Sequence, residues 1–213
     1  MPTATATTPT LPANPPQAWA KPTLSNTYGG KTYEATHPQL FAVEFTAGKG
    51  LEEGYASRLV AVRNYSPGEV ITPLTNISLA PEKAYSSVQF GPGPRDHLEL
   101  NSDLLFMNHS CSPTAQVHLP PDQSQWAVHA SSHGNGIKKG DALTFFYPST
   151  EWDMAQGFEC ACGSDNCLGQ VYGAKHIPVE ELKKRSFINE HILALKEGQQ
   201  GSGVVGARGL CRA

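Results

Sequence analysis

A chain of 213 residues is long enough to form one domain with a hydrophobic core. Charged residues make up only 16% of it, the formal net charge is −3, and no long run of lysine and arginine occurs, which excludes the electrostatic pattern expected for direct nucleic-acid binding. No stretch approaches the roughly 20 apolar residues that a membrane-spanning helix needs, so we expect no membrane partner.

The N-terminal region is rich in proline, threonine and alanine and lacks the uninterrupted apolar run of a secretory signal peptide. The first arginine is Arg58, which argues against an arginine-rich mitochondrial presequence. We therefore expect an intracellular protein, cytoplasmic or nuclear, with reduced cysteines. Residues 1–36 have little to bury and are predicted to form a flexible arm. The alternative is an arm that packs on the domain through Trp19 and Tyr28.

The folded part is expected to begin near residue 37 and to start with short extended segments. Residues 56–62 predict a strand. Pro67 and Gly68 predict a turn after it, because proline presets φ and glycine tolerates positive φ. Extended structure is expected to resume at residues 70–71.

A hairpin and a further strand follow. Residues 125–130 alternate between apolar and polar side chains and can pair with residues 115–119 across a turn that contains two prolines. Residues 142–147 predict another short strand, which Pro148 stops. Many short strands and few helices favour a mainly β fold.

Helical signals are sparse and concentrate near the C-terminus. A short helical piece is predicted near residues 101–107, and a longer region begins at Pro178, a residue well suited to a first helical turn. Gly198 offers a stop, and residues 199–213 are glycine-rich and predicted to be disordered. The apolar residues that share one face of this helical region are Ile188, Ile192 and Leu195.

Three of the five cysteines are clustered at Cys160, Cys162 and Cys167. Clustered thiols in a reducing compartment indicate metal ligands or reactive groups before disulfides. A structural zinc site needs four ligands, so this cluster leaves one position open. The alternative is a set of buried or stray thiols. Cys211, in the predicted tail, is expected to be a bystander.

Three motifs together resemble the catalytic half of a SET-domain methyltransferase with a post-SET zinc-binding segment. They are Asn108-His109-Ser110-Cys111, the run from Gly140 to Tyr147, and the cysteine cluster with its preceding Phe158. The resemblance covers about residues 40–175. It implies a mainly β SET-domain fold of small curved sheets with a pseudo-knot, few short helices and a C-terminal helical segment. The expected organisation is an N-terminal arm at 1–36, a SET domain at 37–150, a post-SET zinc segment at 151–175, a helical segment at 176–198 and a disordered tail at 199–213.

The resemblance also implies roles for individual residues. Cys111 would be the fourth ligand of a zinc ion bound by Cys160, Cys162 and Cys167. The S-adenosylmethionine site would include Gly48, Lys49 and Gly50, Asn108, His109 and Phe158. The glycine signal is weak alone, His109 is equally consistent with a satisfied core histidine, and Phe158 with packing on the zinc segment.

Tyr147 matches the catalytic tyrosine of that family, and Phe145 occupies the position that tunes how many methyl groups are added. A lysine amine has a pKa of about 10.4 and must lose its proton before it attacks a methyl sulfonium. An apolar channel disfavours the charged amine, and a phenolic oxygen can orient its lone pair. Phe145 leaves room that a tyrosine hydroxyl would fill, which favours more than one addition. The alternative for Tyr147 is a buried strand residue.

Several departures from the family pattern bear on the substrate. Leu105 and Thr114 stand where the family often has arginine and asparagine, and Phe146 stands where it usually has aspartate. The cysteine-rich segment that can precede such domains is missing.

These features lead to three functional hypotheses. The first is an S-adenosylmethionine-dependent N-methyltransferase that acts on a protein lysine. The second is a small-molecule methyltransferase or another biosynthetic enzyme on a SET scaffold, and the third is a catalytically silent SET module. Fold similarity alone does not choose between the first two. The substrate would be a protein lysine or a small amine, and the oligomeric state is not determined by these features.

Overall fold

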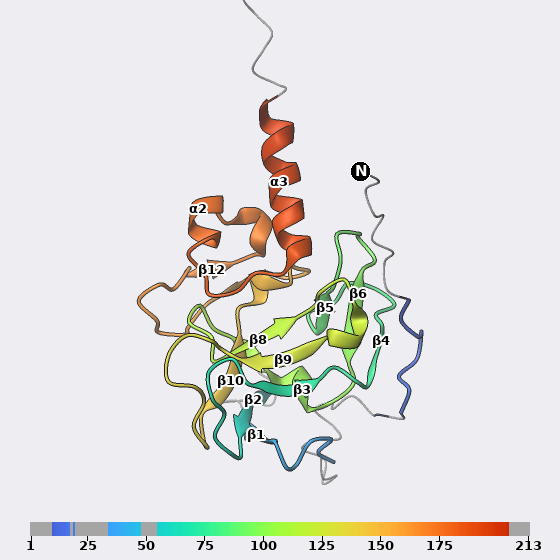
Figure 1. Cartoon of the computed structure of the whole chain (residues 1–213), viewed down its shortest axis with the longest axis vertical. Coiled ribbons are helices and arrows are strands. Elements are labelled where there is room, and N and C mark those ends of the chain that lie inside the picture. Colours follow the sequence, from blue (N-terminus) through green and yellow to red (C-terminus); the bar gives the residue numbers. More distant parts are fainter. Residues whose placement is uncertain (1–9, 18, 20–33, 48–54, 205–213) are drawn as a thin grey trace, which may run out of the picture.

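The computed structural model describes residues 10–17, 19, 34–47 and 55–204, arranged as Figure 1 shows. Short strands and loops dominate, and the longest helix lies near the C-terminus. The mainly β, SET-like fold is confirmed. The strands are β1 (Phe41–Ala47), β2 (Tyr55–Ala61), β3 (Val70–Pro73), β4 (Ile77–Leu79), β5 (Ser87–Gln89), β6 (His97–Leu100), β7 (Asn108–His109), β8 (Ala115–His118), β9 (Ala127–Ala130), β10 (Ala142–Phe145), β11 (Phe158–Glu159) and β12 (Gln170–Val171). The helices are the 3-10 turns η1 (Asp103–Phe106), η2 (Gln123–Gln125), η3 (Tyr147–Ser149) and η4 (Ala174–His176), and the α-helices α2 (Val179–Leu182) and α3 (Glu190–Val204).

The first sheet has the strand order β1-β2-β10-β7 and carries two of the sequence motifs. β1 and β2 form an antiparallel hairpin, and β10 lies antiparallel to β2. β7 then pairs in parallel with β10, with Thr144 opposite Asn108 and Phe145 opposite His109. This pairing brings the two motifs side by side, although they lie far apart in sequence. The expected pseudo-knot stays a prediction.

The predicted hairpin at residues 115–119 and 125–130 is confirmed as β8 and β9, which pair antiparallel next to β3. Alternation explains it, because Val117 and Val128 face each other and are fully buried. The indole of Trp126 is also buried, and its Nε1 donates a hydrogen bond to the Pro120 carbonyl at 2.8 Å. This bond fixes the connection between the two strands.

A third sheet has the order β4-β6-β5 and forms one wall of the candidate site. Strands of three and four residues such as these show too little alternation to be predicted from the sequence. The loop before β5 is tied by Ser87, whose hydroxyl donates to the Ala84 carbonyl at 2.9 Å and accepts from the Ala84 amide at 3.0 Å. The loop therefore presents residues 84–86 in a defined shape.

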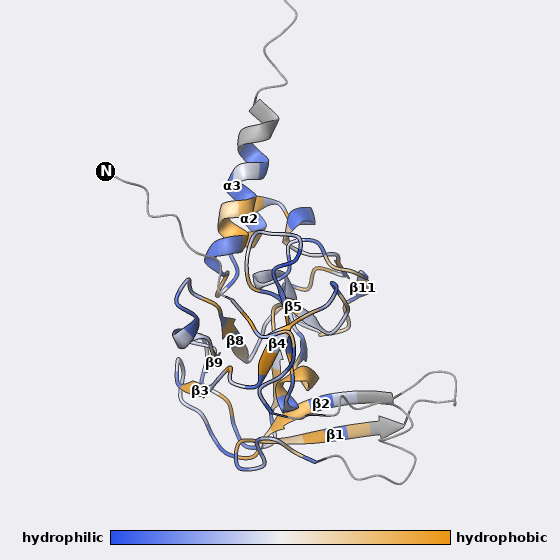
Figure 2. Ribbon diagram, turned by 90° about the vertical axis from the view of Figure 1, so that its right-hand side faces the viewer, coloured by the Kyte–Doolittle hydropathy of each residue, from blue (hydrophilic) through white to orange (hydrophobic). Residues whose placement is uncertain are grey.

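Two groups of buried apolar side chains hold the domain together. The larger group, called the main core, lies among the strands; its largest fully buried members include Trp126, Phe41, Leu59, Leu98 and Met107. The smaller group, called the C-terminal core, consists of Cys111, Phe146, Ala174, Ile177, Leu182 and Ile192. Figure 2 shows hydrophobic residues along the inner strands and mainly polar ones on the outer turns of α3.

The C-terminal segment is helical as expected, but one boundary was wrong. α3 continues through Gly198 to Val204, so the helix does not stop at that glycine. A glycine inside a helix costs only about 1 kcal/mol relative to alanine. Lys196 stabilises this part of α3, because its Nζ donates to the carbonyls of Ala174 and Lys175 at 3.0 and 3.1 Å. Within the described part of the chain, no helix is long and apolar enough to cross a membrane.

Described parts of the N-terminal segment contact the domain. Leu11 is buried, and the Pro12 carbonyl accepts a hydrogen bond from the Leu79 amide at 2.6 Å. The Gln17 amide donates to the side chain of Asn76 at 3.0 Å. Residues 10–17 therefore contact the domain through side chains and backbone other than the predicted anchors Trp19 and Tyr28. Trp19 is half-buried, whereas Tyr28 lies outside the described residues. Flexibility of the segment 1–36 as a whole stays a prediction.

Candidate functional site

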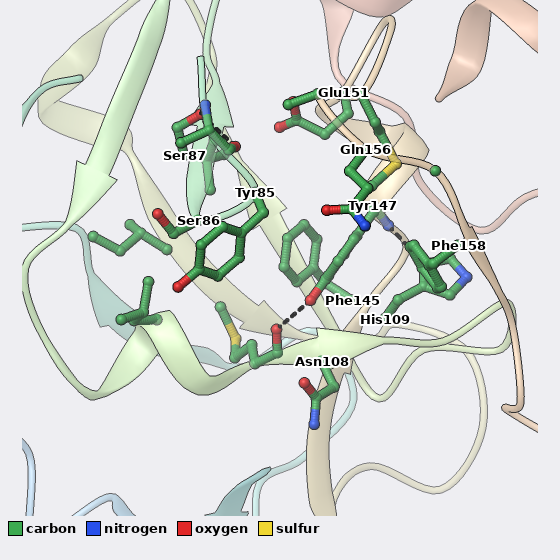
Figure 3. Close-up of a pocket in the computed structure, with 18 of the residues that line it drawn as sticks. Tyr85, Ser86, Ser87, Asn108, His109, Phe145, Tyr147, Glu151, Gln156 and Phe158 are labelled. Atoms are coloured by element: carbon green, nitrogen blue, oxygen red, sulfur yellow. Dashed lines mark hydrogen bonds between the residues drawn. The ribbon is translucent and has the colours of Figure 1, made fainter. Parts of the chain in front are cut away.

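A pocket of about 630 Å³ lies between the β4-β6-β5 sheet, the β7–β10 pair and the segment before the cysteine cluster. Figure 3 shows Tyr147, Glu151 and Gln156 along one wall and Tyr85, Ser86 and Ser87 along the opposite one. The predicted site residues that line the pocket are Asn108, His109, Phe145, Tyr147, Phe158, Cys160 and Cys162. One cavity thus collects residues from all three motifs.

Hydrogen bonds hold both the side chain and the backbone of Tyr147. Its hydroxyl donates to the Met107 carbonyl at 3.0 Å, and its amide donates to Nδ1 of His109 at 3.1 Å. The expected strand 142–147 ends two residues early, at Phe145, because the 3-10 turn η3 begins at Tyr147 with Pro148 in its first turn. Burial, together with the negative charge of Glu151, raises the pKa of Tyr147 to about 12. The phenol therefore stays protonated at neutral pH, with lone pairs left to accept a hydrogen bond.

His109 is a neutral, satisfied histidine at the centre of these contacts. Burial, with a smaller effect from Arg185, lowers its pKa to about 4. Since Nδ1 accepts from Tyr147, we assign the ring proton to Nε2, which lies 3.3 Å from Sγ of Cys111. His109 therefore links the tyrosine to the cysteine cluster, and its core role and a cofactor role are compatible.

Asn108 connects the pocket to the first sheet. Its Nδ2 donates to the Ser57 carbonyl on β2 at 2.6 Å, and its side chain is otherwise exposed toward the pocket. That bond orients the amide, so the Oδ1 atom keeps its capacity to accept a hydrogen bond from a ligand.

Aromatic rings surround Tyr147. The buried ring of Phe145 lies 4.7 Å from it, measured between centroids. Phe158, on β11, contacts His109 edge-to-face at 5.5 Å and Tyr147 at 6.0 Å. Such rings provide an apolar lining and faces on which a flat or positively charged group can stack.

Glu151 is a pocket residue that the sequence motifs did not reveal. It is buried, its Oε1 accepts from the Gln89 amide at 2.8 Å, and burial raises its pKa to about 7. One signal was present: Glu151 follows Tyr147 by four residues across Pro148, and its amide donates to the Tyr147 carbonyl at 2.9 Å. That spacing places two side chains on one side of a helical turn. The wall at residues 84–86 carried no comparable signal.

The remaining predicted cofactor residues, Gly48, Lys49 and Gly50, lie outside the described residues. Their role stays a prediction.

The four predicted metal ligands come together. The sulfurs of Cys111, Cys160, Cys162 and Cys167 all lie within 4.8 Å of one another, and those of Cys111 and Cys160 are 4.0 Å apart. Four thiolates around zinc at about 2.3 Å would be separated by about 3.8 Å in a tetrahedron. The donor set and its spacing therefore fit a zinc ion. Among the described residues, no other group of three or more cysteine, histidine, aspartate or glutamate side chains lies close enough together to hold a metal ion.

Two of the departures from the family pattern have clear structural settings. Leu105 lines the pocket where the family often has an arginine. Phe146 points away from the pocket into the C-terminal core, where the guanidinium of Arg185 lies 5.1 Å from its ring centroid. Arg185 also donates to the Asn166 carbonyl at 2.9 Å, next to the cysteine cluster. Arg185 thus connects the ring of Phe146 to the loop that precedes Cys167.

The chain is similar in sequence to known methyltransferases. The chain is 44% identical over 133 residues to methyltransferase flvH of Aspergillus flavus, a match that covers 62% of this chain and 70% of flvH. It is 28% identical over 97 residues to the histone-lysine N-methyltransferase ash1 of Drosophila melanogaster, covering 41% of this chain and 4% of ash1. It is 28% identical over 104 residues to the histone-lysine N-methyltransferase ASHH2 of Arabidopsis thaliana, covering 48% of this chain and 6% of ASHH2. No family model matches the chain.

Proposed function

The chain belongs to the same methyltransferase family as flvH, and on that basis we propose that it is an S-adenosylmethionine-dependent N-methyltransferase with a SET-type site that acts on an amine. The observation that carries the proposal is the position of Tyr147, fixed by two hydrogen bonds in a pocket that it shares with Asn108, His109 and Phe158. When bound, S-adenosylmethionine supplies a methyl group already activated on a positively charged sulfur.

The residues present fit such a cofactor. A pocket of about 630 Å³ is within the range of roughly 300 to 1,000 Å³ typical of small-molecule sites. Phe158 and His109 offer aromatic surfaces to a flat base, and the amide of Asn108 offers a polar contact. We assign these three residues to cofactor binding, together with Gly48, Lys49 and Gly50 from the sequence resemblance.

Tyr147 would orient the amine. Its hydroxyl proton is engaged by the Met107 carbonyl, so its oxygen faces the pocket as an acceptor for an N–H of the amine. Phe145 packs against the same ring and limits the space beside the nitrogen. Holding the lone pair of the amine in line with the methyl group makes the reaction of the two bound molecules effectively unimolecular.

Zinc would have a structural role. We propose that Cys111, Cys160, Cys162 and Cys167 hold one zinc ion, because four thiolates leave no open position for substrate. The cluster joins β7 to the segment that carries Phe158, so it would keep the pocket wall closed.

The amine itself has two candidate classes. A lysine side chain of a protein is supported by the two histone-lysine methyltransferases, but their matches span only 4% and 6% of those proteins. A small amine is supported by Leu105 in place of the usual arginine and by the buried carboxyl group of Glu151 in the pocket. A silent binding module is disfavoured, because Tyr147, Asn108 and His109 all face one cavity.

The proposal is tested with methyl-labelled S-adenosylmethionine and a panel of lysine peptides and small amines. We expect label on nitrogen with the wild-type protein, and a fall in kcat of roughly 100-fold for Tyr147→Phe, because a misplaced nucleophile loses that much. Cofactor affinity should stay nearly unchanged, since the lost contact is made to the amine.

Tyr172→Phe is the matched control, because Tyr172 is half-exposed directly after β12 and does not line the pocket. Normal turnover in Tyr147→Phe would make Tyr147 only a packed ring. A wild-type protein that binds the cofactor and methylates no amine would overturn the enzyme assignment.

A further inference from the structure

An amine substrate reaches the pocket with a positive charge and an extra proton, and one side chain of the pocket suits both. We propose that Glu151 binds the ammonium form of the substrate and accepts the proton that its nitrogen must lose. This inference rests on the proposed function and names the substrate class: a small, protonated amine or an ammonium-bearing side chain. Figure 3 shows Glu151 on the same wall as Tyr147.

The carboxyl group of Glu151 is rigidly placed. Its backbone amide bonds to the Tyr147 carbonyl at 2.9 Å, so the two residues belong to one turn. Its Oε1 accepts from the Gln89 amide at 2.8 Å and from the Thr150 hydroxyl at 3.2 Å. The side chain is 9% exposed and still lines the pocket. Its other oxygen, Oε2, is the one that remains for a ligand.

Among the described residues, no permanently charged cation forms an ion pair with this carboxylate. Among the described residues, its ion-pair partner within 4.0 Å is Nδ1 of His97. Burial and the field of Lys83 lower the pKa of His97 to about 4, so this ring is neutral at physiological pH. A buried carboxylate without a cation is costly. A bound ammonium group would supply the missing positive charge, and Glu151 lines the cavity that such a group would enter.

The proton transfer balances. An N–H bond of the ammonium breaks, its electron pair stays on nitrogen, and the proton forms an O–H bond on Oε2 of Glu151. The neutral amine then has the lone pair that Tyr147 orients, and the proton later leaves the carboxyl group to solvent. A base works best when its pKa lies near the operating pH, and burial raises the pKa of Glu151 to about 7.

Several other titratable groups lie around Glu151. Lys83 acts on the carboxyl group from the loop before β5 and opposes the effect of burial on its pKa. His97 on β6 and His191 on α3 both have lowered pKa values because they are buried, and Asp96 faces these two histidines. Tyr147 has its pKa raised to about 12. Burial raises the pKa of Glu151 to about 7, whereas it lowers the pKa values of the two histidines below their ordinary value and raises that of Tyr147.

The test is the pH dependence of kcat/KM, measured with n-butylamine and with a single-lysine peptide. With wild type, log kcat/KM should rise to about pH 7 and then level off, because protonated substrate is productive once Glu151 is ionised. In Glu151→Gln only the neutral amine is productive. Its log kcat/KM should therefore rise with unit slope toward the amine's own pKa of about 10.4, without a break near 7.

A binding measurement gives an independent readout. By calorimetry at pH 8, Glu151→Gln should bind n-butylammonium at least about tenfold more weakly, the effect of about 1.4 kcal/mol, and 1-pentanol equally well. Glu151→Gln keeps the oxygen that accepts from Gln89, and Glu151→Asp keeps the charge if the glutamine variant is unstable. Glu180→Gln, an exposed carboxylate on α2, is the matched control and should behave as wild type.

The outcomes separate this inference from the proposed function. If wild type and Glu151→Gln both climb without a break through pH 7 to 9, Glu151 is not the proton acceptor. If they also bind n-butylammonium equally, it is not the cation site. If wild type methylates none of the amines, the proposed function fails, and the calorimetric comparison still decides whether Glu151 holds a cation.

Discussion

The main core gathers buried aliphatic and aromatic side chains from several sheets, whereas the C-terminal core is small and includes the thiol of Cys111 and the ring of Phe146. Leu59 and Leu98 are completely buried there, and their side chains carry no polar group. Around the smaller core lie the partly buried thiols of Cys160 and Cys162. The main core can be stable through burial alone, but the C-terminal core needs another source of stability, which we propose is zinc.

The pocket depends on both cores. Phe145 and Met107 belong to the main core, while Phe158 and Cys160 come from the segment that contains three cysteines of the cluster. Arg185 stabilises the side of the pocket that carries the cysteines, through its contacts with Phe146 and the Asn166 carbonyl. A cofactor site of this kind can be lost without unfolding the strands, simply by loosening one side of it.

The largest expected effect follows from removing the metal. Chelation, or Cys162→Ser, should release the segment after Pro148 and abolish cofactor binding, while the strand signal in circular dichroism persists. The reason is that metal-binding free energy is part of the folding free energy of a structural site. Metal analysis should find one zinc per chain in wild type, and hydrogen exchange should show lost protection in residues 151–177.

Cys211→Ser is the matched control for that experiment, because this fifth cysteine lies outside the described residues and is not a predicted ligand. A fully folded wild-type protein without zinc would remove the distinction between the two cores.

A second, smaller effect on cofactor affinity is expected where Asn108 connects the pocket to the first sheet. Asn108→Ala should weaken S-adenosylmethionine binding about fivefold in calorimetry, because it removes one polar contact worth about 1 kcal/mol and frees the Ser57 carbonyl. Asn64→Ala is the control: Asn64 also joins two distant segments, accepting from the Lys139 amide at 2.8 Å, but lies outside the pocket. Equal cofactor affinity in the two variants would exclude Asn108 from the site.

The cysteine cluster and the central hairpin could be predicted because their signals are local or chemically specific. Val117 and Val128 follow simple alternation. Thiol spacing predicted the cluster of Cys160, Cys162 and Cys167, and the family resemblance added Cys111; the four sulfurs lie within 4.8 Å of one another. The parallel pairing of β7 with β10 was not predicted, since no periodicity in the sequence connects residues 108 and 144.

The rest of the site depends on long-range packing. Glu151 becomes a pocket residue because β5 lies opposite it, and a strand of three residues leaves no usable pattern. The helix end was mispredicted at Gly198 because the stabilising contacts of Lys196 come from η4, about 20 residues earlier. Local preference was outweighed there by tertiary hydrogen bonds.

The smallest expected effect concerns the number of methyl groups added rather than the rate of the first. Phe145 is buried with its ring 4.7 Å from that of Tyr147. In Phe145→Tyr a hydroxyl would occupy space beside the reacting nitrogen and leave less room for an already methylated amine. Mass spectrometry of products should show a shift toward the monomethyl form, with the first addition changed only modestly. Phe187→Tyr, at a ring stacked on His118 away from this pocket, should leave the distribution as in wild type. An unchanged distribution in Phe145→Tyr would mean that the main core does not shape the acceptor end of the pocket, and that Glu151 and the facing loop at residues 84–86 set its size instead.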